Sequence, residues 1–219
     1  MAVESSIVAT VTNRIMELFE QLEENPYQVP AGVSARHLHL QRDHVDALFG
    51  PGYQLTPMKP LSQVGQYACQ ETVEVIGPKG KPIKMRVLGP ERKRTQVEVS
   101  LSDSRNLGVI PPVRTSGDIA GSPGLTIRGP KGEITISEGL IIPDRHVHMT
   151  PADAAWFGVR DGERVSFQAD GEKGGILRNV VVRVTDQSWL DFHIDTDDAN
   201  AFQIKQGQML TLIKERNTK

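Results

Sequence analysis

The stretch Arg36-His37-Leu38-His39 returns in the second half of the chain as Arg145-His146-Val147-His148. Four of the six histidines therefore stand in two matched Arg-His-x-His motifs. In an extended strand successive side chains alternate between the two faces, so both histidines of a motif project from the same face. Each motif predicts a pair of imidazoles held side by side on a strand.

The likeness between the two halves continues beyond these motifs. Each motif is followed by a short polar segment that ends in Phe-Gly, which predicts a short helix stopped by glycine. Farther along, the expected strand 96–100 aligns with the expected strand 191–195, and this alignment makes Glu98 and His193 equivalent. Each half therefore offers two histidines and one further candidate ligand.

Length and composition limit the kinds of protein that this chain can be. With 219 residues, of which 38% are hydrophobic, the chain can bury one large core or two modest ones. A formal net charge of -2 gives no electrostatic case for binding nucleic acid. The single cysteine, Cys69, excludes an internal disulfide bond and a cysteine-rich zinc site, and it is typical of a reducing, intracellular compartment. We interpret Cys69 as a small buried side chain and not as a nucleophile, because no histidine lies near it in sequence.

Residues 1–25 form a separate segment with a helical pattern. Apolar residues recur on one side of a helix between positions 7 and 22, and Asn25-Pro26 ends the pattern. Polar residues interrupt the apolar ones and no basic leader precedes them, so we expect neither a signal peptide nor a membrane span. Two interpretations are equally supported: a helix packed on the core of its own domain, or an amphipathic helix that docks on another protein. Deleting residues 1–25 would inactivate the protein in the first case and leave catalysis nearly intact in the second.

The rest of the chain predicts a mainly β protein. Short strands separated by Gly and Pro turns, with few long helices, favour barrels over a parallel doubly wound sheet. We expect two related β-barrel domains, formed by internal duplication, with short helices and the N-terminal amphipathic helix. The first domain covers residues 26–113 and the second, with the crossover, residues 114–219, and strands could be exchanged between the halves. Residues 50–70, which contain three prolines, are expected to form a loop insertion that the second domain lacks. The expected helices are 43–49, 102–109, 151–157 and 197–202, and the expected strands of the later part of each domain are 71–76, 83–88, 95–101, 164–168, 176–184, 189–194 and 209–213.

The two sets of candidate ligands favour catalytic metal sites. Imidazole and carboxylate groups without thiolate suit zinc best, with other divalent first-row metals as alternatives. A structural zinc is closed by four protein ligands, whereas a catalytic zinc keeps three and leaves a position for water or substrate. A lone His-x-His is more often a coincidence than a ligand pair, but its duplication with the same leading arginine argues for metal. The expected sets are His37, His39 and Glu98 in one half, and His146, His148 and His193 in the other; His44, which has no counterpart, is left out.

Four motifs together span most of the chain from about residue 29 onward. They are Gly32-Val33-Ser34-x-Arg36-His37-x-His39-Leu40, Gly89-Pro90-x-Arg92 leading into Gln96-Val97-Glu98, Arg145-His146-x-His148-Met149, and His193-Ile194-Asp195-Thr196-Asp197-x-Ala199-Asn200-Ala201. In these motifs the chain resembles the PduL-type phosphate propanoyltransferases, the phosphotransacylases of bacterial microcompartments.

The resemblance implies a reversible transfer of an acyl group, propanoyl in the type enzymes, between coenzyme A and inorganic phosphate. It also implies two zinc ions per chain, a tandem β-barrel fold, and an N-terminal helix that acts as an encapsulation peptide. The protein would then work in the lumen of a bacterial microcompartment, or otherwise in the cytoplasm, with shell or core proteins as partners. We expect a homo-oligomer that binds neither nucleic acid nor membrane.

The resemblance also assigns roles to residues outside the ligand sets. By its family position Arg92 is the candidate catalytic residue that clamps phosphate, since a guanidinium presents a planar fork that matches phosphate oxygens. Ser116, in the glycine-rich crossover, and Ser34 are candidate substrate-binding residues. Phosphate is already a dianionic nucleophile at neutral pH, so its attack on a thioester needs charge neutralisation and a polarised carbonyl more than a strong base.

Two other functions fit the same residues. A zinc-dependent acyl-CoA thioester hydrolase would release thiol without phosphate. A non-catalytic, zinc-stabilised scaffold protein of the microcompartment would close each metal with four protein ligands. Phosphate dependence separates the first of these from acyl transfer, and the ligand count separates the second.

Overall fold

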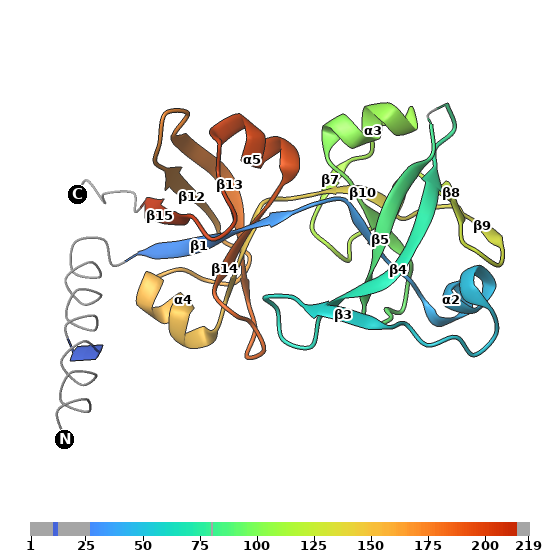
Figure 1. The fold of residues 1–219 in the computed structure, drawn as a ribbon. Coiled ribbons are helices and arrows are strands. Elements are labelled where there is room, and N and C mark those ends of the chain that lie inside the picture. The colour runs from blue at the N-terminus through green and yellow to red at the C-terminus, as the bar shows by residue number, and fades with distance from the viewer. Residues whose placement is uncertain (1–10, 13–26, 80, 214–219) are drawn as a thin grey trace, which may run out of the picture.

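The computed structural model describes residues 11–12, 27–79 and 81–213. A closed barrel of six strands lies beside a nine-stranded sheet that curls into a half-barrel (Figure 1). The fold is mainly β with short helices, as the sequence predicted. Apart from residues 11 and 12, which are helical and exposed, the predicted N-terminal helix lies outside the described residues. Within the described ranges, no helix has the length and apolar character needed to cross a membrane.

The closed barrel is built mainly from the second half of the chain. Its strands follow the order β1-β14-β11-β13-β12-β15. Their bounds are β1 (Gln28–Ser34), β11 (His146–Met149), β12 (Arg164–Ala169), β13 (Gly175–Val184), β14 (Asp191–Asp195) and β15 (Met209–Ile213), and the helices that accompany them are α4 (Pro151–Phe157) and α5 (Thr196–Phe202).

The curled sheet follows the order β7-β10-β6-β2-β5-β4-β8-β9, with β3 paired to β4. Its strands are β2 (His37–His39), β3 (Pro57–Pro60), β4 (Tyr67–Ile76), β5 (Ile83–Gly89), β6 (Gln96–Glu98), β7 (Val113–Arg114), β8 (Leu125–Arg128), β9 (Glu133–Ile136) and β10 (Leu140–Pro143), and its helices are α2 (Arg42–Phe49) and α3 (Leu101–Leu107).

Neither sheet is built from one half of the chain alone. Strand β1 lies in the barrel, where it pairs in parallel with β14, and strand β10 lies in the curled sheet, where it pairs in parallel with β6. Figure 1 shows β1 and β10 running between the two bodies. Only two residues then separate β1 from β2, and two separate β10 from β11. Both Arg-His-x-His motifs therefore begin where the chain passes from one sheet to the other.

The middle residue of each motif anchors it in a hydrophobic core. Leu38 is fully buried in the cluster of the curled sheet, which also contains Val97, and Val147 is fully buried in the barrel cluster, which also contains Phe192. Burying a side chain of this kind is worth roughly 1.5–3 kcal/mol. Because alternate residues of a strand face opposite ways, the burial of Leu38 and Val147 turns the flanking histidines away from these cores.

The helix after the second motif has clear end signals. Thr150 accepts a hydrogen bond from the backbone N–H of Asp153, and the Asp153 carboxylate accepts one from the backbone N–H of Thr150. This capping box, together with Pro151 in the first turn, starts α4 at the predicted residue. Gly158 stops the helix with a φ of 64°, a conformation that glycine adopts without strain.

The prediction of a loop at residues 50–70 is wrong in part. The segment contains β3 and the first residues of β4, and β3 pairs only with β4. Proline lacks a backbone N–H, but an edge strand tolerates it because one side of the strand needs no ladder hydrogen bonds. Two of the three prolines, Pro57 and Pro60, therefore lie in an edge strand where we predicted a loop. The predicted strand 95–101 is also shorter, because Ser100 caps α3 by accepting a hydrogen bond from the Asp103 N–H.

Candidate functional site

The two motifs occupy matching positions in their sheets. Strand β2 pairs antiparallel with β6, which places His37 opposite Glu98, and β11 pairs antiparallel with β14, which places His146 opposite His193. Glu98 and His193 are thus equivalent in strand register, as the alignment of the two halves predicted. The third candidate ligand of each set comes from the strand next to its motif.

The structure brings each set of three side chains together. Within each set one ligand atom per residue lies within 4.8 Å of those of the other two, and the six side chains are the ones predicted from the sequence. In the second set the imidazole centroids are 4.8 Å apart for His146 and His148, 5.1 Å for His146 and His193, and 4.9 Å for His148 and His193. In the first set His37 Nε2 lies 3.4 Å from an oxygen of Glu98. Each set could therefore surround one cation.

Hydrogen bonds to the backbone fix the orientation of the first histidine of each motif. His37 Nδ1 donates to the carbonyl of Ala35 at 2.9 Å, and His146 Nδ1 donates to the carbonyl of Asp144 at 2.8 Å. A carbonyl oxygen only accepts, so the proton lies on Nδ1 and the lone pair of each ring lies on Nε2. Both imidazoles are held in the tautomer that a metal ligand of this type uses.

The electrostatics of the clusters suit a cation. Burial lowers the pKa of His39 to about 3, that of His146 to about 4 and that of His148 to about 2, so these three imidazoles are neutral at physiological pH. Burial opposes ionisation of Glu98, but its electrostatic interactions with His37 and His39, a hydrogen bond from Ser116 and the positive charge of Arg92 outweigh this effect and hold the pKa of Glu98 below its usual value. His39 Nδ1 is buried and has no hydrogen-bond partner among the described residues, which is rare for a polar atom unless something else occupies its lone pair.

We expect the metal-free protein to lose stability as the pH falls below about 6.5. An unfolded histidine gains a proton near that pH, whereas His39, His146 and His148 in the folded protein stay neutral to much lower pH. The unfolded state then binds more protons than the folded state, so each of these histidines lowers the free energy of unfolding by up to about 1.4 kcal/mol per pH unit. Thermal unfolding of chelator-treated protein between pH 8 and pH 5 should show a falling Tm. A flat Tm would contradict the burial of these rings.

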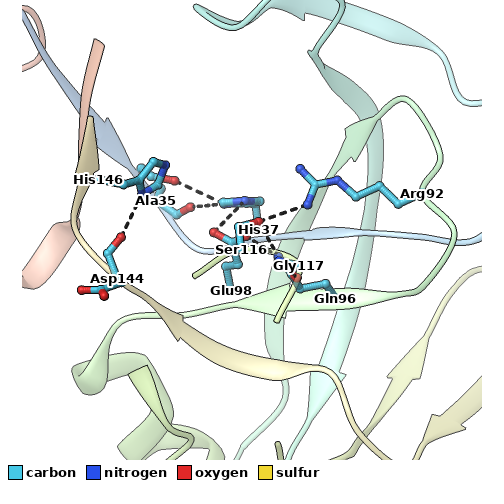
Figure 2. A network of polar contacts seen from close by, with 10 residues as sticks. Ala35, His37, Arg92, Gln96, Glu98, Ser116, Gly117, Asp144 and His146 are labelled. Carbon is cyan, nitrogen blue, oxygen red and sulfur yellow. Dashed lines mark hydrogen bonds and ion pairs between the residues drawn. The ribbon is translucent and has the colours of Figure 1, made fainter. Parts of the chain in front are cut away.

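Arg92 and Ser116 join the first cluster through one hydrogen-bond network, shown in Figure 2. The Arg92 guanidinium points toward Ser116 and donates to its hydroxyl oxygen at 3.1 Å. The Ser116 hydroxyl donates in turn to Glu98 at 2.8 Å. Burial, together with the positive charge of Arg183, lowers the pKa of Arg92. Among the described residues no carboxylate forms a direct ion pair with Arg92; the charge of Glu98, on the other side of Ser116, raises its pKa but does not contact the guanidinium.

All of the sequence-predicted site residues line one cavity of about 650 Å³. This cavity lies between the barrel and the curled sheet, and it is lined by the two ligand sets, Arg92, Ser116 and Ser34. Ser34 also approaches the first set directly, because its hydroxyl lies 3.4 Å from His37 Nδ1. The exchange of β1 and β10 between the sheets is what brings the two sets to one cavity.

Comparison with known proteins shows the family of the chain. A family model described as phosphate propanoyltransferase matches residues 30–205. The chain belongs to the phosphate propanoyltransferase family. It is 47% identical over 191 residues to a phosphate propanoyltransferase of Rhodopseudomonas palustris (87% of this chain, 84% of the relative) and 45% identical over 205 residues to one of Thermotoga maritima (93% and 97%). A phosphate propanoyltransferase of Priestia megaterium is 49% identical over 212 residues, which is 96% of each chain. The protein is therefore an acyltransferase enzyme.

Several further residues that line this cavity were not predicted from the sequence. Arg183 lies on β13 opposite His148, is half-buried, and has no carboxylate ion-paired to it in the described part of the chain. Lys59 and Arg86 also line the cavity. A signal for Arg183 was present, since it interrupts the apolar run 180–184 of β13, and a cation in such a run needs a reason.

The segment predicted as a loop insertion forms part of the cavity wall. The Ser62 hydroxyl lies 3.4 Å from His193 Nε2, and the Gln63 amide bonds both backbone groups of Trp189. These contacts hold the β3–β4 connection of the curled sheet against the barrel. On this side the cavity is thus bounded by a segment that was predicted to be a loop insertion.

Proposed function

We propose that this enzyme reversibly transfers a propanoyl or similarly short acyl group between coenzyme A and inorganic phosphate, with one zinc ion at each ligand set. The observation that carries the proposal is the meeting, in a single cavity, of two three-residue ligand sets and an arginine that no carboxylate of the described part of the chain ion-pairs. Membership of the phosphate propanoyltransferase family supports the reaction class.

The residues present fit zinc. One set has two imidazoles and a carboxylate, the other has three imidazoles, and both are ligand combinations of catalytic zinc sites. Three grouped donors in each set of described residues favour open sites over the closed sites of a scaffold. The buried and unpartnered His39 Nδ1 also fits a bound cation better than an empty pocket. Bound zinc would supply Lewis acidity, which stabilises a thiolate leaving group and polarises a carbonyl or phosphoryl oxygen.

Positively charged side chains of the cavity are placed to bind the phosphate. Arg92 presents a guanidinium whose hydrogen bond to Ser116 sets its orientation, and Arg183 carries a second positive charge close enough to lower the pKa of Arg92. A dianion between two guanidinium groups relieves their mutual repulsion and gains charge-assisted hydrogen bonds. Lys59 and Arg86, which line the same cavity, place further positive charge where a nucleotide carrying phosphates would enter.

The reaction balances without an additional reactant. A phosphate oxygen attacks the thioester carbonyl carbon, the carbon–sulfur bond breaks, and the proton of hydrogen phosphate ends on the coenzyme A sulfur. The reverse reaction returns the acyl group and the proton by the same route. Because phosphate is already anionic, the residues of the cavity need mainly to hold it against the carbonyl, and two arginines can do this by binding its oxygens.

We expect zinc-loaded protein to release thiol from propanoyl-CoA only when phosphate is present. Thiol release is followed with a thiol reagent, and acyl phosphate is trapped as the hydroxamate; the two products should form in equal amounts. Thiol release is expected to depend on phosphate because the cations of the cavity bind phosphate as the nucleophile. Thiol release at the same rate without phosphate would instead identify a thioester hydrolase and end the proposal.

A further inference from the structure

The third ligand of each set has a matched neighbour two residues earlier on the same strand. Gln96 lies opposite His39 in the β2–β6 pairing, and Asp191 lies opposite His148 in the β11–β14 pairing. Both side chains are almost fully buried, with exposed fractions of 2% for Gln96 and 4% for Asp191. They occupy equivalent positions in the two halves, although neither belongs to a ligand set.

Each neighbour holds the side chain that follows it. The Gln96 amide donates to Glu98 and, at 2.8 Å, to the hydroxyl of Ser116, while its own oxygen accepts from the backbone N–H of Gly117 at 2.8 Å. The amide is therefore fixed at both ends. In the other half a carboxylate oxygen of Asp191 lies 2.8 Å from His193 Nε2.

The carboxylate of the pair is the third ligand in the first half and the neighbour of the third ligand in the second half. In the first half the third ligand is an anion, Glu98, and its neighbour Gln96 is neutral. In the second half the third ligand is an imidazole, His193, and its neighbour Asp191 is a carboxylate. Each half thus keeps one carboxylate in the pair. A second carboxylate beside Glu98 would repel it, and a neutral amide beside His193 would be a weaker acceptor than Asp191.

The contact with Asp191 selects one nitrogen of His193. A carboxylate only accepts hydrogen bonds, so Nε2 carries the proton and the lone pair of the ring lies on Nδ1. Strand β1 packs against this pair: a Cβ atom built on Gly32 would lie 2.7 Å from His193 Cδ2 and 2.8 Å from a carboxylate oxygen of Asp191. The backbone of β1 therefore leaves little room for the ring to turn over.

We propose that Asp191 and Gln96 are positioning residues, each of which aims the third ligand of its own metal site. The inference rests on the proposed function, because it takes the two ligand sets as metal sites. Partners of metal ligands are typically worth 10–100-fold in metal affinity. The two residues should act separately, because among the described residues neither side chain forms a hydrogen bond to a ligand of the other set.

The test uses the full chain in two single-site backgrounds. His37→Ala leaves the second set intact and His146→Ala leaves the first. Zinc affinity is measured by competition with a chromophoric chelator. Asp191→Asn should weaken zinc binding about 10–100-fold in the His37→Ala background and leave it unchanged in the His146→Ala background. Gln96→Leu should give the opposite pattern.

Asp186→Asn is the matched control, since it makes the same chemical change at an exposed residue of the connection that leads to β14. It should alter neither background. If Asp191→Asn weakened both sites equally, or neither, the assignment would be overturned.

A second measurement needs no bound metal. Nitrogen-15 chemical shifts of the imidazoles in the metal-free wild-type protein should show His193 protonated at Nε2, and Asp191→Asn should convert it to a mixture of tautomers. A wild-type His193 protonated at Nδ1 would refute the role of Asp191. Wild-type protein that bound no zinc would instead refute the zinc of the proposed function, while the tautomer would still test the contact.

Discussion

Replacing His146 with alanine is expected to empty the second metal site and to reduce phosphate-dependent acyl transfer about 10³-fold. The substitution removes one of three clustered imidazoles, and its lone pair on Nε2 has no substitute in the cluster. A catalytic metal stabilises transition-state charge by several kcal/mol, and about 4 kcal/mol corresponds to a factor of 10³. Metal content per chain, measured by elemental analysis, should fall from two zinc ions to one.

The chain offers a histidine for a matched control. His44, on α2, bonds to Thr95 and does not line the cavity. His44→Gln should therefore keep two zinc ions and nearly full activity. Two zinc ions and full turnover in His146→Ala would show that the second set is not a working metal site.

The positions of the ligand sets could be predicted because the signals for them are local. Leu38 and Val147 are apolar residues between histidines, and strand alternation alone turns the flanking imidazoles to the other face. The equivalence of Glu98 and His193 could be read from the repeat, because a duplicated fold preserves its strand register.

Other parts of the site depend on contacts between distant segments. The parallel pairing of β1 with β14 joins the beginning and the end of the described chain, and no local pattern in β1 specifies its partner. Arg183 reaches the cavity because β13 pairs with β11, and Ser62 reaches it because the β3–β4 connection crosses to the barrel. Strand periodicity predicts which side chains share a face, but it does not predict which strands become neighbours.

Arg92→Ala is expected to raise the KM for phosphate about 10²-fold while both zinc ions remain bound. Among the described residues the hydrogen bonds of the guanidinium reach the first set through Ser116, so its loss removes a charged donor to phosphate without removing a metal ligand. A hydrogen bond to a charged group is worth about 1.5–3 kcal/mol, and 2.7 kcal/mol corresponds to about 10²-fold in affinity. The KM for propanoyl-CoA should change much less, because the thioester does not carry the charge that Arg92 neutralises.

Two further variants separate the guanidinium fork from simple charge. Arg92→Lys keeps the positive charge but loses the planar pair of donors, and it should fall between wild type and Arg92→Ala. Arg94→Ala serves as the control, because Arg94 is exposed on the same turn and its ion pair is with Glu138, outside the cavity. It should leave the KM for phosphate unchanged. An unchanged KM for phosphate in Arg92→Ala, with zinc content intact, would remove Arg92 from the phosphate site. Arg183 would then be the next cation to test, because its charge lies close to Arg92 and no carboxylate of the described residues forms an ion pair with it.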